Sequence, residues 1–251
     1  MTTVRLTLEY DGTAYAGWQI QPNGLSVQQV VEDALARVVG EPVRLHSSGR
    51  TDAGVHALGM VAHFQTERAL PLSAYREGVN RFLPRDVAVT EAAIAPEGFH
   101  ARFSARGKWY RYIIYQGPVR SPLRERTSWH IRSALDVAAM ALGARSMVGR
   151  HDFAAFRSSS CEARTSIREI FSLEILPHGD LLFVDVKGSG FLKNMVRIMV
   201  GTLVEIGMGK RSVRDVETLL REGRREGAGC TAPAQGLCLK EVWYETPGIE
   251  G

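Results

Sequence analysis

The order of strand-like and helix-like segments most restricts the fold of this chain, because one order of elements occurs twice. In the first half, alternating apolar and polar residues predict strands, and apolar residues at helical spacing predict two helices. The segments are a strand at 4–10, a helix from Ser26 to Gly40, strands at 42–45 and 60–64, a helix at 73–82 and a strand at 87–94. This βαββαβ order is typical of a ferredoxin-like unit.

The second half repeats the order without obvious sequence identity to the first. Its segments are a strand at 109–115, a helix at 134–147, strands at 166–176 and 181–186, a helix at 191–206, an extra helix at 213–221 and a strand at 237–244. We therefore predict the α+β class, with two tandem ferredoxin-like units whose antiparallel or mixed sheets combine across the chain. Domains are predicted at 1–105 and 106–251, with a cleft at their junction, near 99–106.

Composition and absent motifs limit the function classes. The chain has 251 residues, of which 45% are hydrophobic and 23% charged, enough for one large or two small cores. Its apolar stretches are short, and the N-terminus lacks the apolar core of a signal peptide, so we expect a cytoplasmic protein without a membrane segment. The three cysteines and seven histidines lack metal-ligand spacing, and no P-loop or Rossmann glycine fingerprint is present. We therefore expect no metal and no cofactor.

A polar, glycine-punctuated segment at 46–57 separates two predicted strands and presents Asp52 between Arg50 and His56. A carboxylate beside a fixed cation stays ionised near neutral pH, because the opposite charge lowers its pKa. Asp52 could then act as a nucleophile or a base. The alternative is a plain turn in which Asp52 bonds its own backbone, and residue chemistry alone favours that reading.

Basic and aromatic residues are concentrated in the middle of the chain. Residues 102–132 carry a local charge of +7, whereas the whole chain has a formal net charge of only +4. Basic groups neutralise phosphates and aromatic faces stack on exposed bases, so this segment predicts an RNA-binding patch. A solvated strand face with core aromatics is the alternative. The predicted patch cations are Arg102, Arg106, Lys108, Arg111 and Arg120, and the interleaved aromatics include Phe103 and Trp109.

The segment Gly49-Arg50-Thr51-Asp52-Ala53-Gly54-Val55-His56-Ala57 resembles the active-site motif of the tRNA pseudouridine synthase A family. Three further blocks are similar to family signatures and follow the family's order. They are residues 10–19 (YDGTAYAGWQ), 110–115 (YRYIIY), and 191–197 (FLKNMVR) with Val200 and Gly201. Four ordered blocks spread over most of the chain make the resemblance specific.

The resemblance implies conversion of uridine to pseudouridine in tRNA, at positions 38–40 on the 3′ side of the anticodon arm. This isomerisation breaks the bond from C1′ of ribose to N1 of uracil, rotates the base and joins C1′ to C5. No atoms or electrons are gained, so the reaction requires neither a redox cofactor nor an energy source. The resemblance also implies a homodimer whose two subunits jointly hold one tRNA.

The same resemblance implies roles for five residues. Asp52 is the catalytic carboxylate, and Arg50 helps to displace the target nucleotide, which must leave the base stack. Tyr110 stacks on the flipped uracil, Arg197 pairs with Asp52, and Leu237 lines the uracil pocket. Two positions near the C-terminus depart from the family pattern: Gln235, where an acid is common, and Cys238, where an aromatic is common.

Several alternatives stay open at this stage. Asp52 could attack C1′, add to the uracil ring or remove the C2′ proton, and the sequence does not name the tRNA species or the dimer interface. A non-catalytic tandem RNA-recognition protein would share the two sheets, but the chain lacks the RNP1 pattern. A nucleoside or glycoside hydrolase would use a second carboxylate at a set distance, and the loop offers none.

Overall fold

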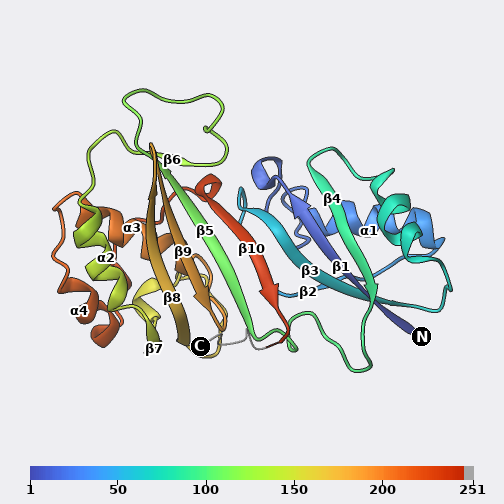
Figure 1. Cartoon of the computed structure of the whole chain (residues 1–251). Helices are drawn as coiled ribbons and strands as arrows, with labels where there is room; N and C mark the ends of the chain where they lie inside the picture. The colour runs from blue at the N-terminus through green and yellow to red at the C-terminus, as the bar shows by residue number, and fades with distance from the viewer. Residues whose placement is uncertain (246–251) are drawn as a thin grey trace. The chain divides into compact units, whose positions relative to one another are not determined.

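The computed structural model describes residues 1–245 and divides into two compact units (Figure 1). The first unit contains residues 1–106 together with the last strand, β10 (Leu237–Trp243), from Leu239 on. The second contains residues 107–238 and therefore holds the first two residues of β10. The domain limits of 1–105 and 106–251 stay a prediction. Within residues 1–245, no helix combines the length and apolar content that crossing a bilayer requires.

The sheet of the first unit is antiparallel. Its strands are β1 (Thr2–Tyr10), β3 (His56–Thr66) and β4 (Val87–Ile94), in the order β4-β1-β3, with β10 on the other side of β3. Alternate residues Val4, Leu6 and Leu8 of β1 are fully buried, as the sequence alternation predicted. The helix α1 (Val27–Val39) covers one face of this sheet (Figure 1).

Local signals set both ends of α1. The Ser26 hydroxyl accepts a hydrogen bond from the Gln29 N–H (3.3 Å), which caps the N-terminus. Gly40 ends the helix with a left-handed backbone, φ 85°. The second predicted helix, at 73–82, contains a π-helical turn, η2 (Ala74–Gly78).

The predicted strand at 42–45 is wrong. Side chains of α1 bind the backbone of Leu45 instead, since its N–H donates to Glu32 (2.9 Å) and its carbonyl accepts from Gln28 (3.3 Å). Because side chains already supply the hydrogen bonds of this N–H and carbonyl, Leu45 does not need a neighbouring strand to pair with. The strand β2 (His46–Ser47) begins only afterwards and pairs with β3 over two residues.

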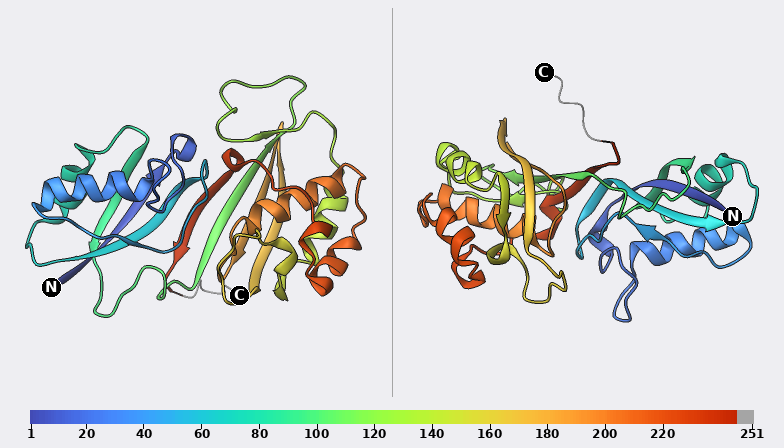
Figure 2. Two further views of the ribbon diagram at one scale, coloured as in Figure 1. Left: turned by 180° about the vertical axis from the view of Figure 1, so that it is seen from behind. Right: turned by 90° about the horizontal axis from the view of Figure 1, so that it is seen from below.

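The second unit has an antiparallel sheet in the order β5-β9-β8-β7, with helices on one face (Figure 2). The strands are β5 (Gly107–Tyr115), β6 (Trp129–His130, parallel to β5), β7 (Gly149–Asp152), β8 (Ile167–His178) and β9 (Leu181–Gly188). The helices are α2 (Val137–Arg145), α3 (Met195–Gly207) and α4 (Asp215–Glu222). Short 3₁₀ turns are η1 (Gly12–Ala14), η3 (Ala154–Phe156), η4 (Arg225–Gly227) and η5 (Ala234–Gly236). The predicted α+β class is confirmed.

The helix α3 starts later than the sequence predicted. Periodicity placed its start at residue 191, but Asn194 has a left-handed backbone (φ 61°) and the helix begins at Met195. A left-handed residue cannot continue a right-handed helix, so the turn before it is separate. Asn194 is the single non-glycine residue with positive φ among the described residues.

Three histidines of the first unit form a cluster, which we call the histidine cluster: His46, His63 and His100. The His63 ring, 5% exposed, lies 5.3 Å from that of His46 and 4.8 Å from that of His100. Burial, together with the neighbouring His100 and His46, lowers the pKa of His63 to about 4. In residues 1–245, no group of three or more His, Cys, Asp or Glu side chains is arranged to hold a metal ion.

The lowered pKa of His63 predicts acid sensitivity of folding. Unfolded His63 takes up a proton near its usual pKa of about 6.5, whereas the folded residue resists protonation down to about 4. The contribution of neutral His63 to the free energy of unfolding should therefore be fully present above pH 6.5 and be lost, by up to about 3 kcal/mol, as the pH drops to 4. Urea unfolding of wild type and His63→Asn at several pH values measures the difference. The difference in free energy of unfolding between wild type and His63→Asn should change from pH 7 to 4, whereas the difference for the exposed control His178→Asn should not. A constant difference for His63→Asn would contradict the prediction.

Candidate active site

Asp52 lies on the loop between β2 and β3 and is partly exposed, beside exposed Arg50. The loop contains a real turn, because the Val55 N–H donates to the Asp52 carbonyl (3.1 Å) and Gly54 has φ 78°. The turn predicted from the sequence as the alternative to a chemical role is therefore present. It involves only backbone groups of Asp52 and Val55, so it is compatible with a chemical role for the Asp52 carboxylate.

The loop is held by the segment of residues 10–18, which we call the clamp. The Tyr10 hydroxyl lies 2.8 Å from the Thr51 hydroxyl, and the Trp18 N–H donates to the Thr51 carbonyl (3.1 Å). Both Tyr10 and Trp18 are buried, so these bonds are shielded from water. The Gly12 N–H also donates to His56 Nδ1 (3.1 Å). The chain is therefore fixed on both sides of Asp52, at Thr51 before it and at His56 four residues after it.

Two glycines allow the clamp to approach the loop. A Cβ at Gly12 would collide with the Val55 carbonyl, and one at Gly17 would lie 2.7 Å from the Thr51 carbonyl. Gly17 also has φ 99°, a conformation that favours glycine. The sequence showed residues 10–19 as a family-like block but did not reveal that this block supports the loop. The two glycines were the available signal.

Tyr110, Arg197 and Leu237 lie on neighbouring segments of the second unit. Tyr110 on β5 is 8% exposed, and its ring meets that of Phe191 edge-on, with centroids 5.2 Å apart. Arg197 on α3 donates from Nε to the Ala232 carbonyl (2.7 Å). Leu237 is buried at the start of β10. These three predicted residues all belong to the second unit, whereas Asp52 and Arg50 belong to the first.

The residues around Arg197 hold its guanidinium in place. Nη1 donates to the Asn194 side chain (3.1 Å), and the Ala232 N–H donates to the Arg197 carbonyl (3.1 Å). The left-handed backbone of Asn194 places that side chain in the turn before α3. A strained backbone of this kind often occurs at a functional site. Asn194 was not among the predicted site residues, and its place in the 191–197 block was the available signal.

The predicted RNA-binding cations differ in their surroundings. Arg102, Arg106 and Arg120 are exposed, and Lys108 is partly exposed. Arg111 instead forms a bidentate ion pair with Asp185, with two N–O distances of 2.7 Å. These hydrogen bonds raise the pKa of Arg111, and Asp185 is only 4% exposed. The charge of Arg111 is therefore already compensated within the fold.

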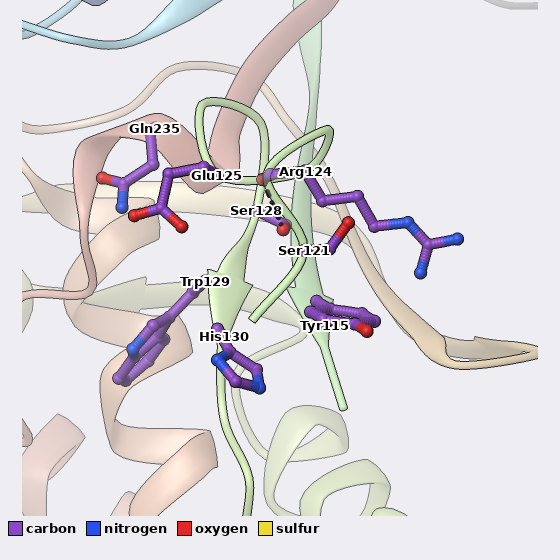
Figure 3. Close-up of a pocket in the computed structure, with 8 residues that line it drawn as sticks. All are labelled: Tyr115, Ser121, Arg124, Glu125, Ser128, Trp129, His130 and Gln235. Carbon is purple, nitrogen blue, oxygen red and sulfur yellow. Dashed lines mark hydrogen bonds between the residues drawn. The ribbon is translucent and has the colours of Figure 1, made fainter. Parts of the chain in front are cut away.

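A cavity of about 210 Å³ lies beside β5 and β6 (Figure 3). The Arg124 guanidinium covers the Tyr115 ring at 4.9 Å and pairs with Asp180 at 2.5 Å. Gln235, one of the two departures from the family pattern, also lines this cavity. The lining residues are Tyr115, Ser121, Arg124, Glu125, Ser128, Trp129, His130 and Gln235. The volume is below the roughly 300–1,000 Å³ that is typical of small-molecule sites.

Comparison with known proteins identifies the family. A family model described as tRNA pseudouridine synthase matches residues 7–104 and 144–245, which include the Asp52 loop, the clamp and α3. The chain belongs to the tRNA pseudouridine synthase family. The predicted resemblance is therefore confirmed.

Relatives of this tRNA pseudouridine synthase match over almost the whole chain. The tRNA pseudouridine synthase A of Syntrophotalea carbinolica is 65% identical over 97% of this chain and 97% of its own. Those of Pelobacter propionicus and Geobacter sulfurreducens are 59% and 58% identical, over 97% of this chain and 100% of their own. Among solved structures, a chain of a Cbf5-Nop10-Gar1 complex has a TM-score of 0.38 at 10% identity, covering 94% of this chain and 57% of its own. That distant likeness adds nothing to the family assignment.

The clamp predicts that Gly17→Ala harms this synthase more than an ordinary glycine substitution. The new Cβ must push the Thr51 carbonyl away, which displaces Asp52, the predicted catalytic carboxylate, and small displacements of a catalytic group cost up to about 100-fold in rate. We expect roughly 10-fold to 100-fold slower pseudouridine formation. Gly40→Ala is the matched control, because Gly40 has φ 85° but open space around its Cα. Equal rates for the two variants would contradict the clamp.

The ion pair between Arg111 and Asp185 predicts a structural role for this arginine. Asp185→Asn leaves a half-buried cation without its partner and should lower the free energy of unfolding by about 3 kcal/mol. The exposed pair of Arg124 and Asp180 is the control, since Asp180→Asn should cost less than about 1 kcal/mol. Urea unfolding measures both values. If Arg111→Met instead weakened tRNA binding without changing stability, Arg111 would belong to the RNA-binding patch.

Proposed function

We propose that this tRNA pseudouridine synthase acts on the anticodon arm of tRNA and uses Asp52 as its catalytic carboxylate. As a member of its family, the chain is an isomerase that converts uridine to pseudouridine in tRNA. The observation that carries the finer proposal is the clamp. It fixes Thr51 on one side of Asp52 and His56 beyond it, within the segment that matches the family motif.

A carboxylate carried on a fixed stretch of backbone suits this reaction. The bond from C1′ to N1 breaks, the bond from C1′ to C5 forms, C5 loses a proton and N1 gains one, so the product is an isomer. A single carboxylate close to the glycosidic bond can promote the first step by attack or by proton removal. Holding the group in place before the substrate arrives saves the cost of ordering it during the reaction.

The second unit supplies the proposed groups for the detached base. Tyr110 stacks on uracil and places its hydroxyl near the proton lost from C5, and its packing against Phe191 supports a fixed ring. Leu237 provides apolar contact. The family resemblance supports a role for Arg197 as the partner of the catalytic carboxylate, and within the second unit Ala232 and Asn194 anchor its guanidinium.

The proposed RNA contacts are electrostatic. Arg50 is exposed, and its planar cation can fill the space that the displaced nucleotide leaves. Arg102, Arg106 and Arg120 are exposed and suit phosphates, so tRNA affinity should fall steeply with salt. The family resemblance and the composition support two further proposals, a homodimer that holds one tRNA and a cytoplasmic location.

Tritium release tests the catalytic role of Asp52. An unmodified tRNA transcript that carries 5-tritiated uridine must lose tritium to water when C5 joins C1′. Wild type should release tritium, whereas Asp52→Asn should release none and still bind tRNA within about 3-fold of wild type, because only one side chain at the reacting bond has changed. Asp33→Asn, on the exposed side of α1, is the control.

The outcomes separate three functions. Full activity of Asp52→Asn would remove Asp52 from the mechanism. Tight binding by wild type without any release would favour a non-catalytic RNA-binding module. Release of free uracil would indicate a hydrolase.

A further inference from the structure

The segment between β4 and β5 (Figure 1) carries an exposed aromatic residue, Phe103. Phe103 is 77% exposed, although a phenylalanine normally gains free energy by burial. One neighbour is the His100 ring, 4.3 Å away with an angle of 34° between the ring planes. Another is the Arg102 guanidinium, 5.8 Å from the ring centroid. Phe103 therefore has supporting groups beside it and a ring that solvent reaches.

The short segment that carries Phe103 is held by its own hydrogen bonds. His100 Nδ1 accepts the N–H groups of Arg102 (3.1 Å) and Phe103 (3.4 Å). Ser104 and His100 exchange two more bonds, one of 3.0 Å from the His100 N–H to the Ser104 hydroxyl and one of 2.9 Å from the Ser104 N–H to the His100 carbonyl. These four hydrogen bonds fix the backbone around Phe103, so the position of its side chain is defined although the ring is exposed.

Ala101 fixes the segment to the first unit. This residue is fully buried, its N–H donates to His63 Nδ1 (3.2 Å), and its carbonyl accepts from the Tyr244 hydroxyl (2.8 Å). The histidine cluster thus forms the base on which Phe103 stands. The three rings of His46, His63 and His100 lie within 4.8–5.8 Å of one another.

We propose that Phe103 is a stacking platform for an unpaired nucleobase of the bound tRNA, next to phosphates held by Arg102 and Arg106. An aromatic face binds any exposed base, and the cations beside it suit the RNA backbone. Residues 96–106 contain one acid, Glu97, against these two arginines, so the charge favours a polyanion. The inference rests on the proposed function, because it takes tRNA as the ligand.

The platform is distinct from the proposed site for the isomerised uridine. His63, which supports the platform, lies seven residues along β3 from His56, which follows the Asp52 loop. At about 3.3 Å per strand residue, this separation is roughly 20 Å. Phe103 therefore contacts a different nucleotide from the one that Asp52 modifies, and it contributes to binding and positioning rather than to bond cleavage.

Binding measurements in the Asp52→Asn protein test the platform without turnover. Loss of one base–aromatic stack predicts a Kd for tRNA that is about 5-fold to 100-fold higher for Phe103→Ala. Phe103→Trp should retain the affinity, and its emission should be quenched when tRNA binds. The matched control is Phe82, which is 46% exposed in the same unit with the Arg37 guanidinium 5.5 Å from its ring centroid. Phe82→Ala should leave the Kd unchanged.

Each outcome decides one point. Equal Kd values for Phe103→Ala and Phe82→Ala, at unchanged thermal stability, would overturn the platform even if wild type releases tritium. A change of oligomeric state in Phe103→Ala without a change in Kd would also overturn it and would assign the face to contacts between copies of this chain. Failure of wild type to release tritium would count against the proposed function, whatever Phe103 does.

Discussion

The close approach of the clamp to the Asp52 loop is the constraint on which the proposed chemistry depends. The Asp52 loop is mostly polar and glycine-rich, with Val55 as its one large apolar residue, so contacts from other segments are needed to fix its position. The Trp18 N–H and the Tyr10 hydroxyl supply these contacts through Thr51, and both come from residues buried in the first unit. Two motif blocks that are about 40 residues apart in the sequence are therefore one structural element.

The second unit also fixes the position of a predicted site residue, Arg197, through hydrogen bonds with neighbouring segments. Arg197 is a long, flexible side chain, and its position is fixed by a carbonyl at Ala232 and by the side chain of Asn194. The segment that contains Ala232 is itself tied to β5, because the Tyr112 hydroxyl donates to the Pro233 carbonyl (2.8 Å). In both units, hydrogen bonds to backbone carbonyls and to neighbouring side chains thus support the residues proposed to be functional, and rigid support of this kind is what positioning of a reactive group requires.

Local signals in the sequence predicted most of the fold. The Ser26 cap and Gly40 gave the limits of α1, and the alternation in β1 gave its buried face. The wrong strand at 42–45 arose where residues distant in the sequence intervened. Gln28 and Glu32 bind Leu45 and replace the expected strand, and no local pattern shows such a contact.

The candidate site shows the same division. Motif resemblance named Asp52, Tyr110 and Arg197, but it could not show how they are supported. Gly12 and Gly17 belonged to a recognised block, yet their purpose depends on carbonyl groups more than 30 residues away. Residues that act through packing leave a weaker trace in a single sequence than residues that carry a reactive group.

The ion pairs on the hairpin of β8 and β9 change the expected salt dependence of tRNA binding by the basic segment, residues 102–132. Asp180 and Asp185 neutralise Arg124 and Arg111, so two of the cations that give residues 102–132 their charge already have a carboxylate as counterion. The ions released on binding are the cations condensed on the RNA, and only protein cations that neutralise a phosphate release them. The logarithmic dependence of tRNA affinity on salt concentration therefore reports fewer phosphate contacts than the arginines and lysine in this part of the sequence would imply.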